Sequence, residues 1–252
     1  MDSAKSRYLL AEKLWFEGKY AAAVGEFERV ISKDPHSKWG LQALFRSATT
    51  QMFFLSQYEE ALKKFKVFSE TGQDARSVWE AKKQMGEIYF AHLERYEQAA
   101  SHYRALLISR PDSEDSPEFM FRIGRSYFFL WKFKEAIHTY QEIIDKFPDS
   151  NWAEKAWLEM GITYFTQGGR QNSQGSEAYQ EAIDIYEKFL RRYPKSQWVP
   201  QAKFGIAACL EEMDQLDAAY YRYRDLVSSY PSPEIIQIKL KRISERKQQR
   251  NH

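Results

Sequence analysis

The side chains that could catalyse a reaction or bind a metal are sparse in this sequence. Its histidines and its one cysteine stand at His36, His92, His102, His138, His252 and Cys209. A metal site or a nucleophilic centre needs such groups at a short, defined spacing, as in His-Glu-x-x-His, and none of them has it. The paired carboxylates at Glu59–Glu60 and Glu211–Glu212 are typical of solvated helix faces. The sequence therefore predicts a protein that is not an enzyme and uses no metal or cofactor.

A glycine-rich stretch is the other feature that could bind a ligand. Residues 166–176 read Thr-Gln-Gly-Gly-Arg-Gln-Asn-Ser-Gln-Gly-Ser. A phosphate-binding loop of this kind follows a strand and carries Gly-Lys-Ser or Gly-Lys-Thr, and neither signal is present. Because the stretch is polar and holds three glycines, we expect an exposed, mobile loop. It is interpreted as a plain insertion or as a contact for a partner.

The composition of the chain limits which classes of function and partner remain open. The net charge of the 252-residue chain is only +2, so bulk charge favours no particular partner. Cys209 has no second cysteine with which to form a disulfide, and it shares an apolar helix face with Ile206 and Leu210. That placement favours a buried, inert thiol. No apolar run approaches the roughly 20 residues that span a membrane. We therefore expect no membrane contact except through a partner or a missing lipidated leader.

The elements that must position any site are repeated helices. Proline closes a helical segment at Pro35, Pro111, Pro148, Pro194 and Pro231, and Gln73, beside Gly72, fills one more such slot. The intervals between these positions are 38, 38, 37, 46 and 37 residues. A fixed period of roughly 20–50 residues is typical of helical solenoids, in which no repeat buries its apolar face alone.

The repeated residues resemble the tetratricopeptide repeat. The fourth repeat has Met120, Ile123, Gly124 and Tyr127, then Ala136, Tyr140 and Pro148; the fifth has Trp157, Met160, Gly161 and Tyr164, then Ala182, Tyr186 and Pro194. This order of large, small and aromatic residues on two helices resembles the tetratricopeptide pattern. The resemblance implies an all-α, right-handed solenoid that binds other proteins. It implies about six helix pairs and a capping helix in one domain, residues 1–252, with expected ranges of 4–37, 38–75, 76–113, 114–149, 150–195, 196–232 and, for the cap, 233–249.

A recurring linker points to a narrower group of these proteins. Proline, serine and tryptophan recur with the same spacing in three linkers, at 35–39, 148–152 and 194–198. Proline ends one helix, serine caps the next, and tryptophan occupies its first turn. The longer repeat resembles the bacterial cell-envelope branch, which includes the Tol–Pal coordinator and the outer-membrane assembly lipoprotein. As written, the chain starts without a leader or an N-terminal cysteine, so we expect a cytoplasmic location. A periplasmic location is the alternative if a leader was removed.

The first helices are expected to line the concave side of the solenoid, where partners bind. An aromatic row recurs on them with the repeat, at Trp15, Phe53, Phe90, Phe128 and Phe165. The same faces carry Arg46, Lys83, Phe121 and Arg125. We predict a groove for an amphipathic helix or an extended segment of a partner. The alternative is that the aromatic row packs between helices as core.

The C-terminal segment 234–252 is strongly basic. Six lysine and arginine residues outnumber two glutamates, which gives a charge of +4. Ile236, Leu240 and Ile243 form an apolar stripe, which favours a capping helix over the last repeat. The alternative is a basic contact with an acidic protein, nucleic acid or membrane.

These patterns together favour a scaffold or adaptor that binds another protein and has no small-molecule substrate. An exported bacterial envelope-assembly factor is the first alternative. A nucleic-acid or regulatory protein that acts through the basic C-terminal helix is an alternative from another class, and nucleic acid is the less favoured partner.

Overall fold

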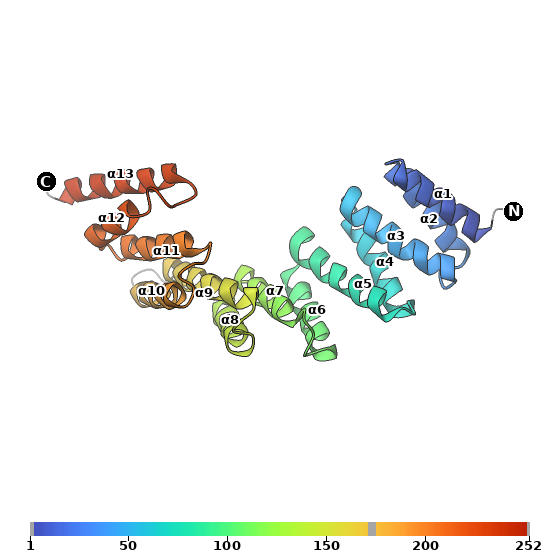
Figure 1. Ribbon diagram of the computed structural model, residues 1–252, viewed down its shortest axis with the longest axis horizontal. Coiled ribbons are helices and arrows are strands. Elements are labelled where there is room, and N and C mark those ends of the chain that lie inside the picture. The colour runs from blue at the N-terminus through green and yellow to red at the C-terminus, as the bar shows by residue number, and fades with distance from the viewer. Residues whose placement is uncertain (1–2, 171–174, 251–252) are drawn as a thin grey trace. The chain divides into compact units, whose positions relative to one another are not determined.

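The computed structural model describes residues 3–170 and 175–250, and every regular element in these ranges is a helix. The chain forms two compact units, Met1–His102 and Tyr103–His252. The N-terminal unit contains α1 (Ala4–Phe16), α2 (Tyr20–Lys33), α3 (Lys38–Phe54), α4 (Tyr58–Thr71), α5 (Ala75–Glu87) and the π-helical turn η1 (Ile88–His92). The division falls inside α6 (Tyr96–Ser109). The C-terminal unit continues with α7 (Ser116–Phe129), α8 (Phe133–Lys146), α9 (Asn151–Arg170), α10 (Gly175–Arg192), α11 (Val199–Glu212), α12 (Leu216–Arg224) and α13 (Pro233–Arg250) (Figure 1).

Within each unit, consecutive helices pack as antiparallel pairs and successive pairs pack on each other, as expected for a helical-repeat solenoid (Figure 1). The predicted fold class is confirmed. None of the helices in the described ranges is long and apolar enough to cross a membrane. Whether residues 1–252 act as one domain stays a prediction.

The turn inside most pairs uses a residue in the left-handed region. These residues are Gly18, Ser56, Glu94, Trp131 and Asp214, with φ of 74°, 53°, 51°, 60° and 62°. The backbone N–H of the next residue then bonds back into the first helix, as from Lys132 to the Tyr127 carbonyl at 2.9 Å. This hydrogen bond satisfies a carbonyl at the end of the first helix and reverses the chain within three residues.

The linker serines cap the following helices in two ways. The hydroxyl of Ser37 accepts the N–H of Gly40 at 3.1 Å, and that of Ser150 accepts the N–H of Ala153 at 3.1 Å. Here the helix starts directly after the serine, as predicted. The Ser196 hydroxyl instead accepts the N–H of Trp198 at 3.0 Å, and α11 starts one residue later. Its second residue is proline, which lacks an N–H and so needs no cap.

Glycine allows close helix contacts in the core of the C-terminal unit. A Cβ on Gly161 would lie 2.4 Å from the ring of Tyr186, and a Cβ on Gly205 would lie 2.4 Å from the same ring. Tyr186 is 3% exposed, so it is held between the first helices of two successive pairs. A Cβ on Gly124 would meet Tyr140 at 2.5 Å in the same way. The small residues of the repeat therefore make room for an aromatic ring from the second helix.

The predicted loop at 166–176 is largely wrong. Residues 166–170 continue α9 and residues 175–176 begin α10, while 171–174 lie outside the described residues. Gly168 and Gly175 are buried, and a Cβ on Gly175 would lie 2.4 Å from the Gly168 carbonyl oxygen. A Cβ on Gly168 would meet the Tyr179 ring at 2.8 Å. These glycines permit a close helix crossing, and the additional residues lengthen two helices.

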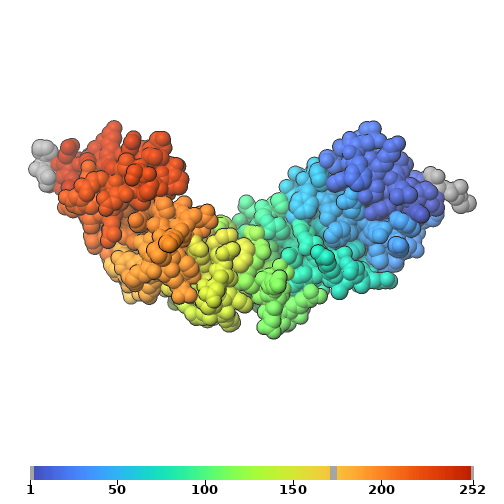
Figure 2. Space-filling view, in the orientation of Figure 1, coloured from blue at the N-terminus to red at the C-terminus, as the bar shows by residue number. Residues whose placement is uncertain are grey.

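Helix α13 covers the last pair. Ile236 and Ile243 are fully buried, and Leu240 packs against the same apolar cluster on α11 and α12. Figure 2 shows the C-terminal helix, in red, packed closely on the preceding helices. The predicted capping helix is confirmed by this packing.

Candidate partner-binding site

Most of the predicted aromatic row packs inside its own helix pairs. Each of four members contacts an aromatic ring on the second helix: Trp15 with Tyr20, Phe90 with Tyr96, Phe128 with Phe133 and Phe165 with Tyr179, at centroid distances of 5.8, 5.8, 6.0 and 5.5 Å. Phe90 is only 9% exposed. These contacts correspond to the core alternative of the prediction.

Phe53 differs from the other four because the second pair is shifted by one residue. Ala48, and not Thr49, is the fully buried small residue of α3. The inward position one turn later is then Met52, which is 4% exposed, and Phe53 is left 60% exposed. The spacing that placed Phe53 in the aromatic row is therefore wrong by one residue in this pair.

The other predicted groove residues hold helices together. Arg46 makes two hydrogen bonds to Glu12 at 2.7 and 3.1 Å and lies 4.5 Å from the Trp15 ring centroid. Phe121 is 7% exposed and packs against Trp152 with ring centroids 5.0 Å apart. Lys83 is half-buried on α5. Phe121 therefore offers no free surface, and Arg46 is already paired.

Arg125 pairs with Glu159 of α9 at 2.7 Å. Burial raises the pKa of Glu159, and the nearby Arg125 opposes that rise. The pair therefore joins α7 to α9 in a poorly solvated setting. Removing either partner would leave the other charge uncompensated.

Phe53 belongs to an exposed group of aromatic side chains in the N-terminal unit. Phe16, Phe53 and Phe54 at the ends of α1 and α3 are 76%, 60% and 46% exposed. Phe54 stacks on Tyr20 at 4.2 Å and meets Trp15 edge-on at 5.5 Å. These contacts hold Phe54 in place; of the three exposed rings, the prediction included only Phe53.

A groove in the C-terminal unit is lined by residues that the sequence analysis did not select as site residues, although one of its helices, α7, carries three predicted residues. We call it the α6–α8 groove; its volume is about 820 Å³ and residues of α6, α7 and α8 line it. Its apolar lining consists of Leu107, Met120, Ile123, Tyr127 and Phe147, and its polar lining includes Arg104, Glu135, His138, Glu142 and Lys146. Apolar surface beside charged groups of both signs suits an amphipathic segment.

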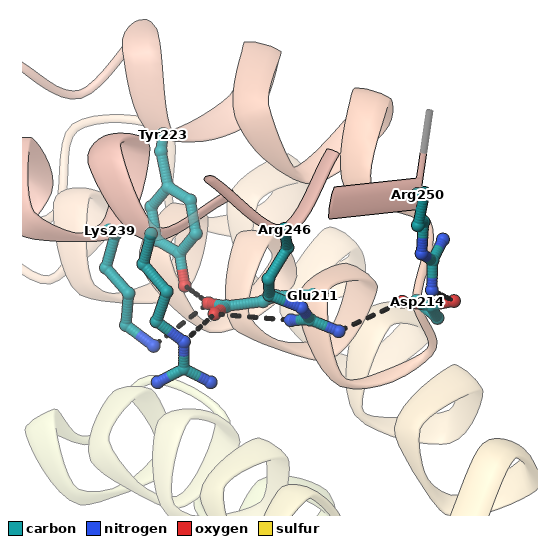
Figure 3. A network of polar contacts seen from close by, with 7 residues as sticks. Glu211, Asp214, Tyr223, Lys239, Arg246 and Arg250 are labelled. Carbon is teal, nitrogen blue, oxygen red and sulfur yellow. Dashed lines mark hydrogen bonds and ion pairs between the residues drawn. The ribbon is translucent and has the colours of Figure 1, made fainter. Parts of the chain in front are cut away.

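The basic C-terminal helix is held by a buried carboxylate. Glu211, on α11, is 1% exposed. Its Oε2 accepts hydrogen bonds from the Tyr223 hydroxyl at 3.0 Å and from Lys239 Nζ at 2.9 Å (Figure 3). Its Oε1 lies 3.3 Å from Arg242 Nε and 3.8 Å from Arg246. The predicted solvated face is thus wrong for Glu211, since α13 covers it; Glu212 is exposed.

Further cations of α13 are paired with two exposed aspartates. Arg246 binds Asp214 at 2.9 Å, and Arg250 binds the other Asp214 oxygen. Lys247 binds Asp217. Most of the basic charge of α13 is therefore already paired with carboxylates of α11, α12 and the turn between them.

Burial, together with the Glu211 carboxylate, raises the pKa of Tyr223.

The histidine and cysteine side chains that could catalyse a reaction or bind a metal do not lie together in the described part of the chain. Burial raises the pKa of Cys209 to about 12, so the inert thiol predicted for it agrees with its environment. His92 is exposed and stacks on Tyr58, and His138 is exposed in the α6–α8 groove. No group of three metal-binding side chains is present in the described ranges.

Comparison with known families agrees with this geometry. Residues 118–150, 155–196 and 201–233 match the model of the tetratricopeptide repeat. These three matches coincide with the three helix pairs from α7 to α12, so these pairs are similar to tetratricopeptide repeats in length and residue pattern. None of the curated proteins matches the sequence.

Solved structures with a similar fold include tetratricopeptide repeat proteins. A tetratricopeptide repeat protein from Parabacteroides merdae is 15% identical over 96% of this chain and 98% of its own, with a TM-score of 0.56. PilW, a type IV pilus biogenesis factor, is 15% identical over 95% and 97%, with a TM-score of 0.57. YrrB, described as having an unusual peptide-binding site, is 16% identical over 80% and 92%, with a TM-score of 0.53. At these identities the likeness extends to the fold alone.

Proposed function

We propose that this protein is a non-catalytic interaction scaffold that binds a segment of a partner protein in the α6–α8 groove. The observation that carries the proposal is the groove itself, with its volume of about 820 Å³ and its predominantly apolar lining. A helix or extended segment can bury one apolar face there while its polar face meets Arg104, Glu142 and Lys146. No covalent chemistry is needed for this role.

The groove is a better candidate than the predicted aromatic row. Phe90 and Phe121 of the predicted site are buried, and Arg46 and Arg125 are engaged in ion pairs within the fold. A partner could reach these residues only by separating helices that already pack. In contrast, the groove presents Leu107, Tyr127 and Phe147 without such a rearrangement.

A displayed library of random peptides of about 16 residues tests the proposal. His138→Trp places a larger ring in the groove without removing a buried contact, because His138 is exposed. Ile108→Trp is the matched control, since Ile108 is 77% exposed on α6 and lies outside the groove lining. We expect peptides selected on the parent to bind His138→Trp about tenfold more weakly and Ile108→Trp equally well.

Two results would contradict the groove assignment. One is that the parent selects no peptide above background. The other is that His138→Trp retains the selected peptides with unchanged affinity. Circular dichroism and a melting curve for each variant show that both remain folded.

We propose an envelope-assembly role as the second candidate, supported by the repeated proline-serine-tryptophan linker. Fractionation of cells that express the gene in its natural host tests this proposal. Recovery of the protein with the periplasm or membranes would support it, and recovery only with the cytosol would contradict it.

A further inference from the structure

A second surface of the C-terminal unit adjoins the α6–α8 groove, and we infer that it binds an acidic stretch of the same partner segment. We call it the Trp131 surface; it is a hollow of about 490 Å³ lined by Trp131, Lys132, Phe133, Lys134, Glu135, Gln167 and Arg170. The inference rests on the proposed function, because it assigns the chemistry of the segment that the groove would hold.

The first supporting observation is unpaired positive charge. Three cations, Lys132, Lys134 and Arg170, line the hollow with one carboxylate, Glu135. Within residues 3–170 and 175–250, none of these cations forms an ion pair. All three are exposed. A carboxylate that binds there gains charge-assisted hydrogen bonds without displacing an existing partner.

The second observation is the conformation of Trp131. Its φ is 60°, whereas the equivalent turns place Gly18, Ser56, Glu94 and Asp214 in this region. A bulky side chain is disfavoured in the left-handed region because its Cβ crowds the following carbonyl oxygen. Nevertheless the indole is 56% exposed, with the Arg170 guanidinium 4.1 Å from its ring centroid. The turn therefore presents a large aromatic face at some cost to the backbone, as is common at functional sites.

The third observation is continuity with the groove. Lys134 and Glu135, in the first turn of α8, line both the α6–α8 groove and the Trp131 surface. A segment in the groove can therefore extend past Lys134 to reach Lys132 and Arg170. Gln167 also lines the hollow, and its buried amide oxygen accepts no hydrogen bond from the described residues.

The pattern favours an acidic protein segment over nucleic acid. Nucleic-acid binding depends on many phosphate contacts along an extended basic stripe. Here only three cations surround a hollow that also contains Glu135, and the chain as a whole has a net charge of +2. A few carboxylates with one apolar side chain match three cations beside an exposed indole.

The test compares two double charge reversals on the full chain. Lys132→Glu with Arg170→Glu reverses the Trp131 surface. Lys188→Glu with Lys195→Glu makes the same change of net charge at exposed positions outside both hollows. Both proteins and the parent are screened with random displayed peptides of about 16 residues and with a labelled oligothymidine of about 20 nucleotides.

We expect the peptides selected on the parent to be enriched in aspartate and glutamate. They should bind the Lys132/Arg170 variant at least about tenfold more weakly and the control variant equally well. Lys132→Gln with Arg170→Gln, which adds no negative charge, should give a smaller loss in the same direction. Equal losses in both charge-reversed proteins, or selected peptides with no excess of acidic residues, would overturn the inference.

The remaining outcomes separate this inference from the groove proposal. Peptides lost in His138→Trp but kept in the Lys132/Arg170 variant would retain the groove and overturn the acidic contact. The opposite pattern would overturn the groove and retain the basic surface. Failure of the parent to select any peptide would overturn both. Tighter binding of oligothymidine than of peptide, lost only in the Lys132/Arg170 variant, would assign the surface to nucleic acid instead.

Discussion

Two basic regions of the C-terminal unit differ in how their charge is used. Helix α13 is the more basic in sequence, yet Lys239, Arg242 and Arg246 surround the buried Glu211. The Trp131 surface is less conspicuous in sequence, since its cations come from residues 132–134 and from Arg170. Its cations have no carboxylate partner within the described ranges. The helix for which a basic contact with a partner was the alternative prediction is thus largely neutralised within the fold.

The charge that a segment presents to a ligand depends on the residues against which the segment packs. The acidic residues Glu211, Asp214 and Asp217 come from α11, α12 and the turn between them, and they face α13 across the last pair. Ion pairs of this kind position a helix more than they strengthen it, because desolvation offsets part of the attraction. The cations of the Trp131 surface have no carboxylate partner within the described ranges and remain available to an acidic ligand.

The largest expected effect comes from removing the buried carboxylate. Glu211→Ala should lower the free energy of unfolding of the C-terminal unit by about 3 kcal/mol, because several cations lose their common partner. Glu212→Ala, at the next and exposed position, should change it by no more than about 0.5 kcal/mol. Urea denaturation followed by circular dichroism measures both. Equal midpoints for the two variants would show that the network around Glu211 does not hold α13.

A charge reversal in each region tests the comparison directly. Arg246→Glu puts a third carboxylate beside Glu211 and Asp214 and should destabilise the protein by about 2 kcal/mol. Arg170→Glu should change stability by no more than about 0.5 kcal/mol, since that cation has no ion pair to lose. The same denaturation measurement applies. A large loss with Arg170→Glu would mean that the Trp131 surface is structural.

Trp131→Asn separates stability from binding at the second region. Asparagine tolerates the left-handed region better than tryptophan, but the variant loses the contact between the indole and Arg170. These effects oppose each other, so the free energy of unfolding should change by less than about 1 kcal/mol. A melting curve measures this change. Affinity for the acidic peptides should still fall. Marked unfolding, or unchanged affinity, would contradict the role given to the exposed indole.

The repeat, its linkers and its cap could be predicted from sequence because each depends on residues close together in the chain. Ser37 caps a helix through an N–H three residues away, and the turn at Trp131 closes within its own pair. The aromatic row recurred with the repeat, but its exposure could not be predicted. A shift of one residue in the second pair exposes Phe53 and buries Met52.

The Glu211 network and the Trp131 surface could not be predicted from the sequence, because each depends on residues far apart in the chain. Glu211 is buried beneath α13, and its partner Lys239 lies 28 residues later in the chain. The Trp131 surface exists because α9 continues to Arg170, where the glycines indicated a loop. Gly168 and Gly175 are small so that two helices can approach, and that use of glycine gives the same local signal as a flexible turn.

The weakest of these effects should be a pH dependence of the melting temperature that arises from Asp214. It tests whether this carboxylate helps to hold α13 in place. Hydrogen bonding and charge from Arg250, with a further contribution from Arg246, lower the pKa of Asp214 from its ordinary value of 3.8. A carboxyl whose pKa is lowered by folding contributes stability that is present above its unfolded pKa and is lost as pH falls through its folded pKa. At neutral pH, Asp214→Asn should therefore melt slightly below the parent, and the difference should shrink as pH falls below about 4. Adding Arg250→Gln should remove most of the difference at neutral pH, because the carboxylate loses its main partner. A gap in melting temperature that stays constant between neutral and acidic pH would show that Asp214 contributes nothing through its charge to the docking of α13.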